Sequence, residues 1–151
     1  MGELAGELMA LFADGFLRKL HVARVRRRLA AGRPVRIPCS ARADGPGGWP
    51  GYVNGRLRIT PGAPAAAFTA RDRDRTGLDR IGPDRTGPDR VELAAGGTFQ
   101  EPEPDAWHDQ DWAATAYLAP GADHPVYLQV DSRYLPMVHA ALTDPASLRT
   151  V

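Results

Sequence analysis

The sequence feature that most constrains the fold is Asn54-Gly55, which stands between two short strand-like stretches. After it, apolar Leu57 and Ile59 alternate with arginines, as in a strand with one buried face. A type I′ turn needs positive φ at both central positions, and Asn-Gly adopts that conformation at little steric cost. The pattern therefore predicts a β-hairpin over residues 49–60, with the arginines on the solvent face of an antiparallel sheet.

A preceding strand is expected over residues 34–42. Val35, Ile37 and Cys39 alternate there with polar residues and proline, so they are expected to face the core. Cys39 is accordingly interpreted as a small core residue rather than a nucleophile. Pro38 lacks the N–H of a ladder hydrogen bond, which indicates an edge position for this strand.

Later segments continue the strand pattern. Strands are expected over residues 65–70, 91–93, 112–118 and 126–130, with residues 98–99 forming a short strand or a loop. Together with the hairpin, these segments predict a mainly β fold with flanking helices (α+β). We expect a bent antiparallel sheet or barrel of about six to seven strands, whose open end a terminal helix covers.

That C-terminal helix is predicted to end near Thr143. Leu135, Val138 and Leu142 recur at helical spacing, and His139 lies close to their face as a structural histidine. Asp131-Ser132 is expected to cap the helix. Residues 144–151 are expected to form a frayed tail or one further turn.

Residues 1–31 lack proline and predict an N-terminal amphipathic and basic helical segment, which kinks or ends at Asp14-Gly15 and stops before Gly32. Its second half is expected to have no clean apolar face. The cations expected to meet an anionic partner are Arg18, Lys19, Arg24, Arg26, Arg27 and Arg28. The residues expected to insert or dock are Phe12, Phe16 and Leu17.

Charge is distributed unevenly along the chain. Residues 1–36 carry a net charge of +5, residues 37–97 of +2 and residues 98–151 of −6. Such asymmetry is typical either of a basic arm that meets an anionic partner or of two ends that neutralise each other. Of the 19 basic residues only Lys19 is a lysine. Ala, Gly and Pro are abundant as well, so the preference for arginine is interpreted as the codon composition of a genome rich in G and C.

Two segments look like loops. Asp-Arg recurs about every five residues over 71–90, a period of neither helix nor strand, so a disordered repeat loop is expected within a β domain over 34–143. Residues 101–111 form an acidic connector containing His108 and Asp109. Imidazole and carboxylate are metal ligands, but no third ligand follows at recognisable spacing, so no metal site is predicted.

No catalytic constellation is recognisable, and the expectation is a protein that is not an enzyme and holds no cofactor. Cys39 is the sole cysteine, which excludes an internal disulfide. The apolar run over residues 4–17 is too short and too charged to span a bilayer, and the acidic N-terminus is unlike a signal peptide. A cytoplasmic location, peripheral to the inner face of the membrane, is expected.

The arrangement of strands and terminal helix looks like the pleckstrin-homology-like (PH-like) superfold. At finer grain, the chain resembles a family of small uncharacterised bacterial membrane-associated proteins with a PH-like soluble part. The resemblance spans residues 18–143, outside the repeat loop. It is carried by Arg24–Arg28, Cys39, Trp49, Gly51, Tyr52, Gly55 and Leu57. It implies a binding or scaffolding role, not a reaction.

Three functions stay open on the sequence alone. The first is a non-enzymatic adaptor that binds an anionic membrane surface or docks a protein partner. The second is a homo-oligomeric interaction protein whose basic arm packs on acidic surface near residues 101–111. The third is nucleic-acid binding through the Arg-rich helix, which the absence of closely spaced aromatic residues disfavours.

Overall fold

The computed structural model describes residues 2–49, 51–71, 90–101 and 111–150, with the side chains of the first helix described from Ala13 onward. Residues 72–89 of the predicted repeat loop and the His108-Asp109 pair fall outside these ranges, while Arg90, the last residue of the predicted loop, begins a strand. Two α-helices occur, α1 (Gly2–Ala30) and α2 (Leu135–Thr143), and α2 is followed by a 3-10 helix, η2 (Pro145–Arg149). The strands are β1 (Val35–Ala43), β2 (Val53–Ile59), β3 (Ala65–Ala70), β4 (Arg90–Ala94), β5 (Thr98–Gln100), β6 (Trp112–Leu118) and β7 (Val126–Asp131).

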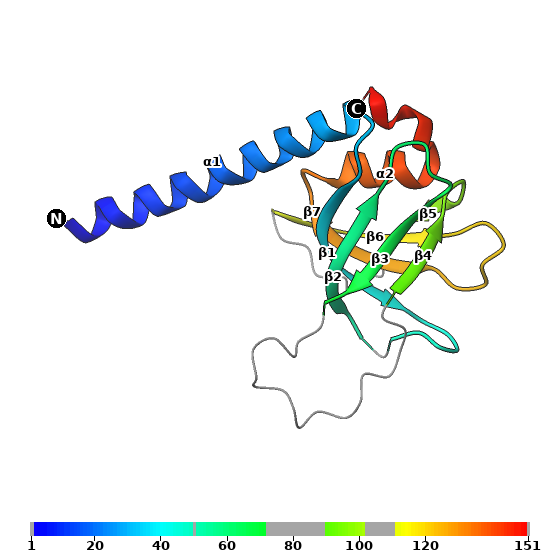
Figure 1. The fold of residues 1–151 in the computed structure, drawn as a ribbon. Helices are drawn as coiled ribbons and strands as arrows, with labels where there is room; N and C mark the ends of the chain where they lie inside the picture. Colours follow the sequence, from blue (N-terminus) through cyan, green and yellow to red (C-terminus); the bar gives the residue numbers. More distant parts are fainter. Residues whose placement is uncertain (1, 50, 72–89, 102–110, 151) are drawn as a thin grey trace.

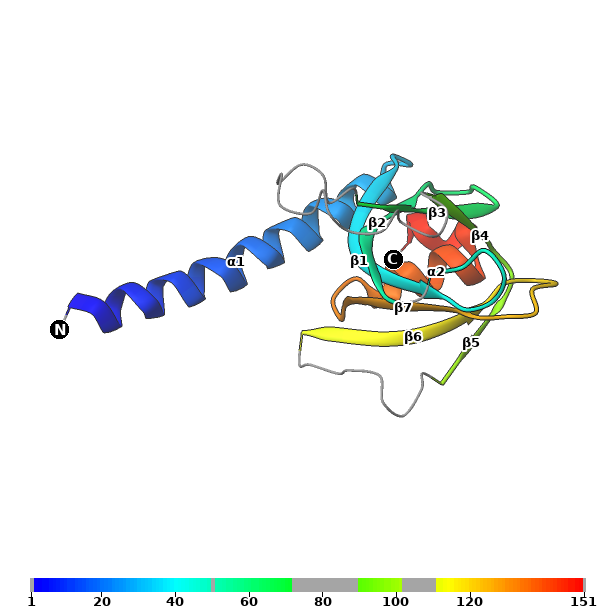
Figure 2. The ribbon, with the colours of Figure 1, turned by 90° about the horizontal axis from the view of Figure 1, so that it is seen from below.

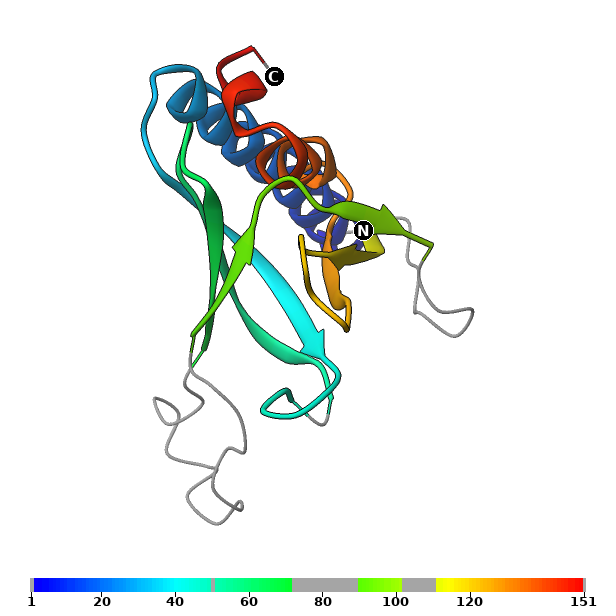
Figure 3. The same ribbon diagram turned by 90° about the vertical axis from the view of Figure 1, so that its right-hand side faces the viewer.

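The seven strands form one antiparallel sheet in the order β4-β3-β2-β1-β7-β6-β5. The sheet curls into a half-barrel, and α2 lies along its concave side (Figures 2 and 3). Met137, Val138, Ala141 and Leu142 of α2 are buried against the inward-facing side chains of the strands. The predicted fold class, mainly β with flanking helices and a C-terminal capping helix, is therefore confirmed.

The predicted turn at Asn54-Gly55 is wrong. Both residues lie inside β2, where Asn54 pairs with Ser40 and Gly55 with Cys39. The chain instead reverses before β2, in a loop where Gly45 and Gly47 have positive φ. Gly55 serves a different purpose, because a Cβ atom there would collide with the ring of Phe68. Its missing side chain makes room for a core aromatic residue on the neighbouring strand.

The prediction of an edge position for β1 is also wrong, although its buried face is correct. β1 lies between β2 and β7, and Val35, Ile37 and Cys39 are all buried. Pairing with β7 begins only at Cys39. Pro38 therefore lies in the part of β1 that pairs with β2 alone, and its missing N–H interrupts no ladder with β7.

Helix α1 is continuous through Asp14-Gly15, where the sequence predicts a kink or an end. Its last third does have an apolar face, contrary to the prediction, because Val22, Val25 and Leu29 are buried in the core at spacings of three and four. The predicted stop is confirmed. Gly32 has φ of 73°, and its N–H donates to the Leu29 carbonyl at 2.9 Å, as in a helix C-cap that favours glycine.

Helix α2 ends at Thr143 as predicted, but Asp131-Ser132 does not cap it. The N-cap residue is Tyr134, which makes no side-chain capping bond, and strand β7 continues to Asp131. The Asp131 carboxylate instead accepts a bond from the Arg133 N–H at 3.0 Å, which closes the turn from strand to helix. After α2 the chain makes the further turn η2, whose Leu148 is fully buried.

The Tyr117 hydroxyl links the turn between the two edge strands of the sheet, β4 and β5, to helix α2 by hydrogen bonds. It accepts a hydrogen bond from the Gly97 N–H at 2.9 Å and lies within hydrogen-bond distance of the carbonyls of Ala94 and Leu142. Ala94 ends β4, Gly97 precedes β5 and Leu142 belongs to α2. This one polar group therefore fixes the turn between the two edge strands against the helix that fills the half-barrel.

Candidate anion-binding groove

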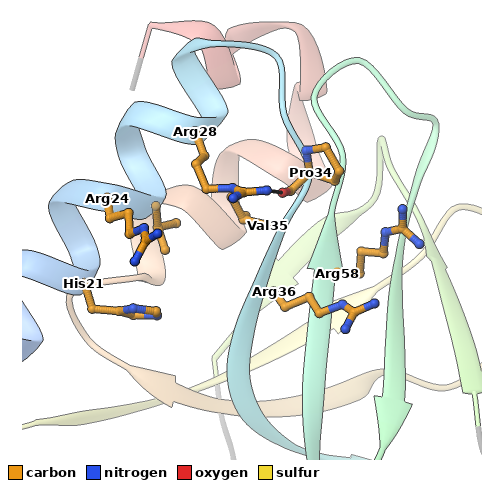
Figure 4. A pocket seen from close by; sticks show the side chains of 8 residues that line it. His21, Arg24, Arg28, Pro34, Val35, Arg36 and Arg58 are labelled. Carbon is orange, nitrogen blue, oxygen red and sulfur yellow. Dashed lines mark hydrogen bonds between the residues drawn. The ribbon is translucent and has the colours of Figure 1, made fainter.

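An open groove of about 440 Å³ lies where the end of α1 meets the start of β1 and the end of β2 (Figure 4). One wall is helical and the other belongs to the two strands. The lining residues are His21, Arg24, Val25, Arg28, Pro34, Val35, Arg36 and Arg58. Four of the eight are arginines, and none is acidic.

The groove exists because the chain reverses sharply between α1 and β1. Val25 on the helix and Val35 on the strand are each 4% exposed, so both walls are anchored in the core beneath the groove. The Arg28 guanidinium donates to the Pro34 carbonyl at 3.4 Å and spans the corner. This contact and the packed valines hold the helical wall in a defined position beside the strands.

The strand wall carries two arginines that face each other directly. Arg36 of β1 and Arg58 of β2 are cross-strand partners, and both point to solvent because their neighbours in each strand are buried. Like charges directly opposite each other in a sheet are unfavourable. The fold therefore tolerates an electrostatic cost at this position.

No acidic side chain relieves that cost within the described part of the chain. The ion pairs there join Arg18 to Asp111, Arg42 to Asp44 and Arg90 to Glu92, and all three lie outside the groove. Glu92 lies two strands away from Arg58 in the register, a separation of about 10 Å. Among the residues that the structure describes, the positive charge of the groove is therefore not compensated, and such a region attracts anions.

The six predicted cations of α1 are all exposed, but they do not share one face. Arg24 and Arg28, one turn apart, line the groove. Arg26 stands two residues from each of them and lies on the other side of the helix, because residues two apart do not face the same way. Arg18 pairs with Asp111 at 3.4 Å, an exposed contact of the kind expected if the basic arm meets acidic surface.

The predicted apolar docking residues are exposed where the structure describes them. Phe16 is 62% exposed and Leu17 is 59% exposed, while the side chain of Phe12 is outside the described part. Leu20, which the sequence interpretation did not single out, is 50% exposed and lies one turn after Phe16. The spacing of four from Phe16 was the signal that could have identified it.

Three groove residues were not predicted: His21, Arg36 and Arg58. The strand alternation correctly assigns Arg58 to the solvent face, but only the pairing of β1 with β2 brings it beside Arg36. His21 lies three residues before Arg24 and so on the same side of α1. Its ring stands edge-on to that of Tyr134, with centroids 6.0 Å apart.

The described residues offer little for covalent or metal chemistry. Burial raises the pKa of the Cys39 thiol to about 12, partly opposed by a backbone hydrogen bond from Leu57. In the described ranges, no three His, Cys, Asp or Glu side chains gather as metal ligands would. Nor does any helix in those ranges combine the length and apolar character that crossing a bilayer requires.

Comparison with known proteins gives the groove no counterpart. No protein-family model, no curated protein and no solved structure matches the chain. The assignment of a function therefore depends on the shape, charge and exposure of the residues described above.

Proposed function

We propose that the protein is a non-enzymatic binding module that docks through α1 on an anionic membrane surface at the inner face of the cytoplasmic membrane. The observation that carries the proposal is the form of α1. The helix extends well beyond the sheet (Figure 1), with Phe16, Leu17 and Leu20 exposed among cations.

The two sides of α1 have different roles. Val22, Val25 and Leu29 bind the helix to the core, and helical periodicity places Phe16 and Leu20 on the opposite side. Large apolar side chains gathered on an exposed surface are typical of interaction sites. An apolar helix face can lie at the boundary of headgroups and acyl chains, while each nearby cation contributes about 1 kcal/mol on an anionic leaflet.

The curled sheet is compatible with the proposal but does not select it. Seven antiparallel strands with a C-terminal helix against the concave side are the arrangement that the PH-like resemblance implies. That superfold hosts lipid binding, peptide binding and scaffolding alike, so the membrane assignment depends on α1 and not on the fold.

Vesicle co-sedimentation of the full chain tests the proposal. Vesicles of phosphatidylglycerol and of neutral lipid are compared at about 50 and 300 mM salt, where surface electrostatics differ strongly. We expect salt-sensitive binding to the anionic vesicles alone. No binding at the lower salt concentration would exclude the proposed docking.

Substitutions locate the contact better than a deletion, because removing α1 would take Val25 and Leu29 out of the core. Phe16→Gln with Leu20→Gln should weaken vesicle binding at least tenfold, since burying each side chain is worth about 1.5–3 kcal/mol. Ala30→Gln, an exposed substitution near the end of α1, is the matched control and should bind like the wild type.

Self-association is a second candidate function. It is supported by the exposed Arg18–Asp111 contact, in which one cation of α1 meets one acidic side chain, and by the exposed Phe16 and Leu20, which could equally pack against a second copy. Sedimentation equilibrium separates the two candidates. A dimer that Phe16→Gln with Leu20→Gln disrupts, combined with no vesicle binding, would favour self-association.

A further inference from the structure

We infer that the groove between α1 and the β1–β2 edge is a binding site for a ligand with two phosphoryl groups, such as a diphosphate. The four guanidinium groups of Arg24, Arg28, Arg36 and Arg58 are its principal contacts. This inference goes beyond docking on a membrane and does not need it, because a soluble ligand can occupy the groove.

The four arginines form two pairs on opposite walls (Figure 4). Arg24 and Arg28 are one helical turn apart on α1, while Arg36 and Arg58 are direct partners across β1 and β2. A guanidinium group is planar and presents paired N–H donors that match two oxygens of one phosphoryl group. Each pair of arginines therefore offers donors and charge for one phosphoryl group.

The size of the groove fits this class of ligand. Sites for small molecules measure about 300–1,000 Å³, and the groove, at about 440 Å³, falls at the smaller end of that range. This volume exceeds what a single phosphate ion needs. The open side leaves room for an organic group attached to the second phosphoryl group.

The surroundings of the arginines favour a dianionic group over a carboxylate. In the part of the chain described, neither Arg36 nor Arg58 has an ion-pair partner, and their direct opposition is unfavourable without an anion between them. His21 adds an imidazole N–H donor at the helical wall, and its contact with Tyr134 restrains the ring. A dianion neutralises more of this charge than a monoanion does.

The fixed position of the two walls also supports binding. The Arg28–Pro34 contact and the buried Val25 and Val35 fix the two walls relative to each other. Because these walls are already in place, little ordering free energy opposes binding.

Isothermal titration calorimetry of the full chain with inorganic pyrophosphate and inorganic phosphate tests the site. We expect pyrophosphate to bind with 1:1 stoichiometry and at least tenfold more tightly than phosphate. Arg36→Ser with Arg58→Ser should weaken pyrophosphate binding at least tenfold, because it removes two charge-assisted contacts. Arg26→Ser with Arg27→Ser changes the net charge equally outside the groove and should change binding less than twofold.

The thermal midpoint of unfolding shows whether a variant has lost the binding site alone or its folded structure. Because Arg36 and Arg58 repel each other, their replacement should leave the thermal midpoint unchanged or raise it. Pyrophosphate should raise the midpoint of the wild type but not of the Arg36→Ser, Arg58→Ser variant. Equal weakening by the two double variants, or no binding of pyrophosphate to the wild type, would overturn the inference.

The phosphoryl groups could come from a soluble diphosphate or from lipid headgroups, and vesicles distinguish these sources. Phosphatidic acid carries one phosphomonoester, so two neighbouring headgroups would supply the two phosphoryl groups, whereas phosphatidylglycerol carries a diester of lower charge. If pyrophosphate displaces the protein from phosphatidic acid vesicles but not from phosphatidylglycerol vesicles, the groove binds lipid headgroups. Binding of pyrophosphate with no such displacement assigns it to a soluble ligand. A polyglutamate peptide that binds as tightly as pyrophosphate would refute selectivity for phosphoryl groups.

The Phe16→Gln, Leu20→Gln variant keeps the groove intact and should bind pyrophosphate like the wild type. If membrane docking fails, this measurement still tests the groove. If the groove fails, vesicle binding through α1 still stands on its own.

Discussion

The ring of Phe68 occupies the space that a side chain at Gly55, on the neighbouring strand, would need. A Cβ atom added to Gly55 would stand 2.5 Å from Cζ of the ring and closer still to the backbone oxygen of Thr69, nearer in both cases than packed atoms approach. Phe68 is 1% exposed and also meets Trp49 edge-on, with ring centroids 5.4 Å apart. The ring is therefore packed in the core on the side of Trp49 as well as on the side of Gly55.

Gly55→Ala should consequently destabilise the fold by about 1–3 kcal/mol, the usual cost of overpacking a core. Urea denaturation followed by fluorescence measures the change in the free energy of unfolding. Gly51→Ala is the matched control, because a Cβ atom there meets nothing within 4 Å, and its effect should stay within about 0.5 kcal/mol. If Gly55→Ala were as stable as the control, the close packing of Phe68 would be contradicted.

Tyr117→Phe should cost about 1–3 kcal/mol, since it leaves the Gly97 N–H without its partner in a part-buried position. Amide hydrogen exchange should quicken selectively in the turn between β4 and β5, because the hydroxyl fixes that turn to α2. Tyr127→Phe is the control, as the Tyr127 hydroxyl makes no hydrogen bond among the described residues. Equal exchange rates in the two variants would show that the hydroxyl does not hold the turn.

The sheet could be predicted from the sequence because buried and exposed residues alternate within each strand, whatever strand lies beside it. Val35, Ile37 and Cys39 face the core as expected, and Leu57 and Ile59 do the same. The prediction of a turn at Asn54-Gly55 was wrong. It was based on the local preference of these residues for positive φ, and that preference does not reveal which side chain of another strand packs over the glycine. Phe68 is thirteen residues from Gly55 and belongs to another strand, so its effect on Gly55 arises only in the tertiary structure.

The candidate site was predicted only in part, for a related reason. Arg24 and Arg28 were identified from the density of cations in α1, which is a local property. Arg36 and Arg58 complete the groove only through the β1–β2 register and the chain reversal after α1. Val25 is buried, so one side of α1 faces the sheet. The sequence does not reveal this orientation, because apolar and basic residues are interspersed along this part of the helix.

Cys39 should be unreactive in the folded protein. Burial raises the pKa of its thiol to about 12 from 9.0, so almost no thiolate is present at pH 8. A disulfide reagent such as dithionitrobenzoate should therefore react with Cys39 at the rate of unfolding, and rapidly in denaturant. Fast reaction under native conditions would contradict the buried position. Because the folded pKa is the higher one, the contribution of this thiol to stability is lost as the pH rises above about 9.

The last prediction concerns His139, whose ring stacks on Phe99 at a centroid distance of 3.9 Å. Burial lowers the pKa of His139 below its ordinary value of 6.5. The unfolded chain therefore binds a proton more readily than the folded chain as the pH falls through 6.5. The free energy of unfolding should decrease below that pH, with a slope of at most about 1.4 kcal/mol per pH unit from this group.

Urea denaturation between pH 7.5 and 5 measures that slope in the wild type and in His139→Leu, which cannot take up the proton. We expect the leucine variant to have a flatter pH profile, because a half-buried apolar side chain at this position retains the contact with Phe99. His124→Gln is the control, since His124 is exposed in the turn before β7. An identical slope in the wild type and in His139→Leu would show that burial at this position does not disfavour the charged imidazole.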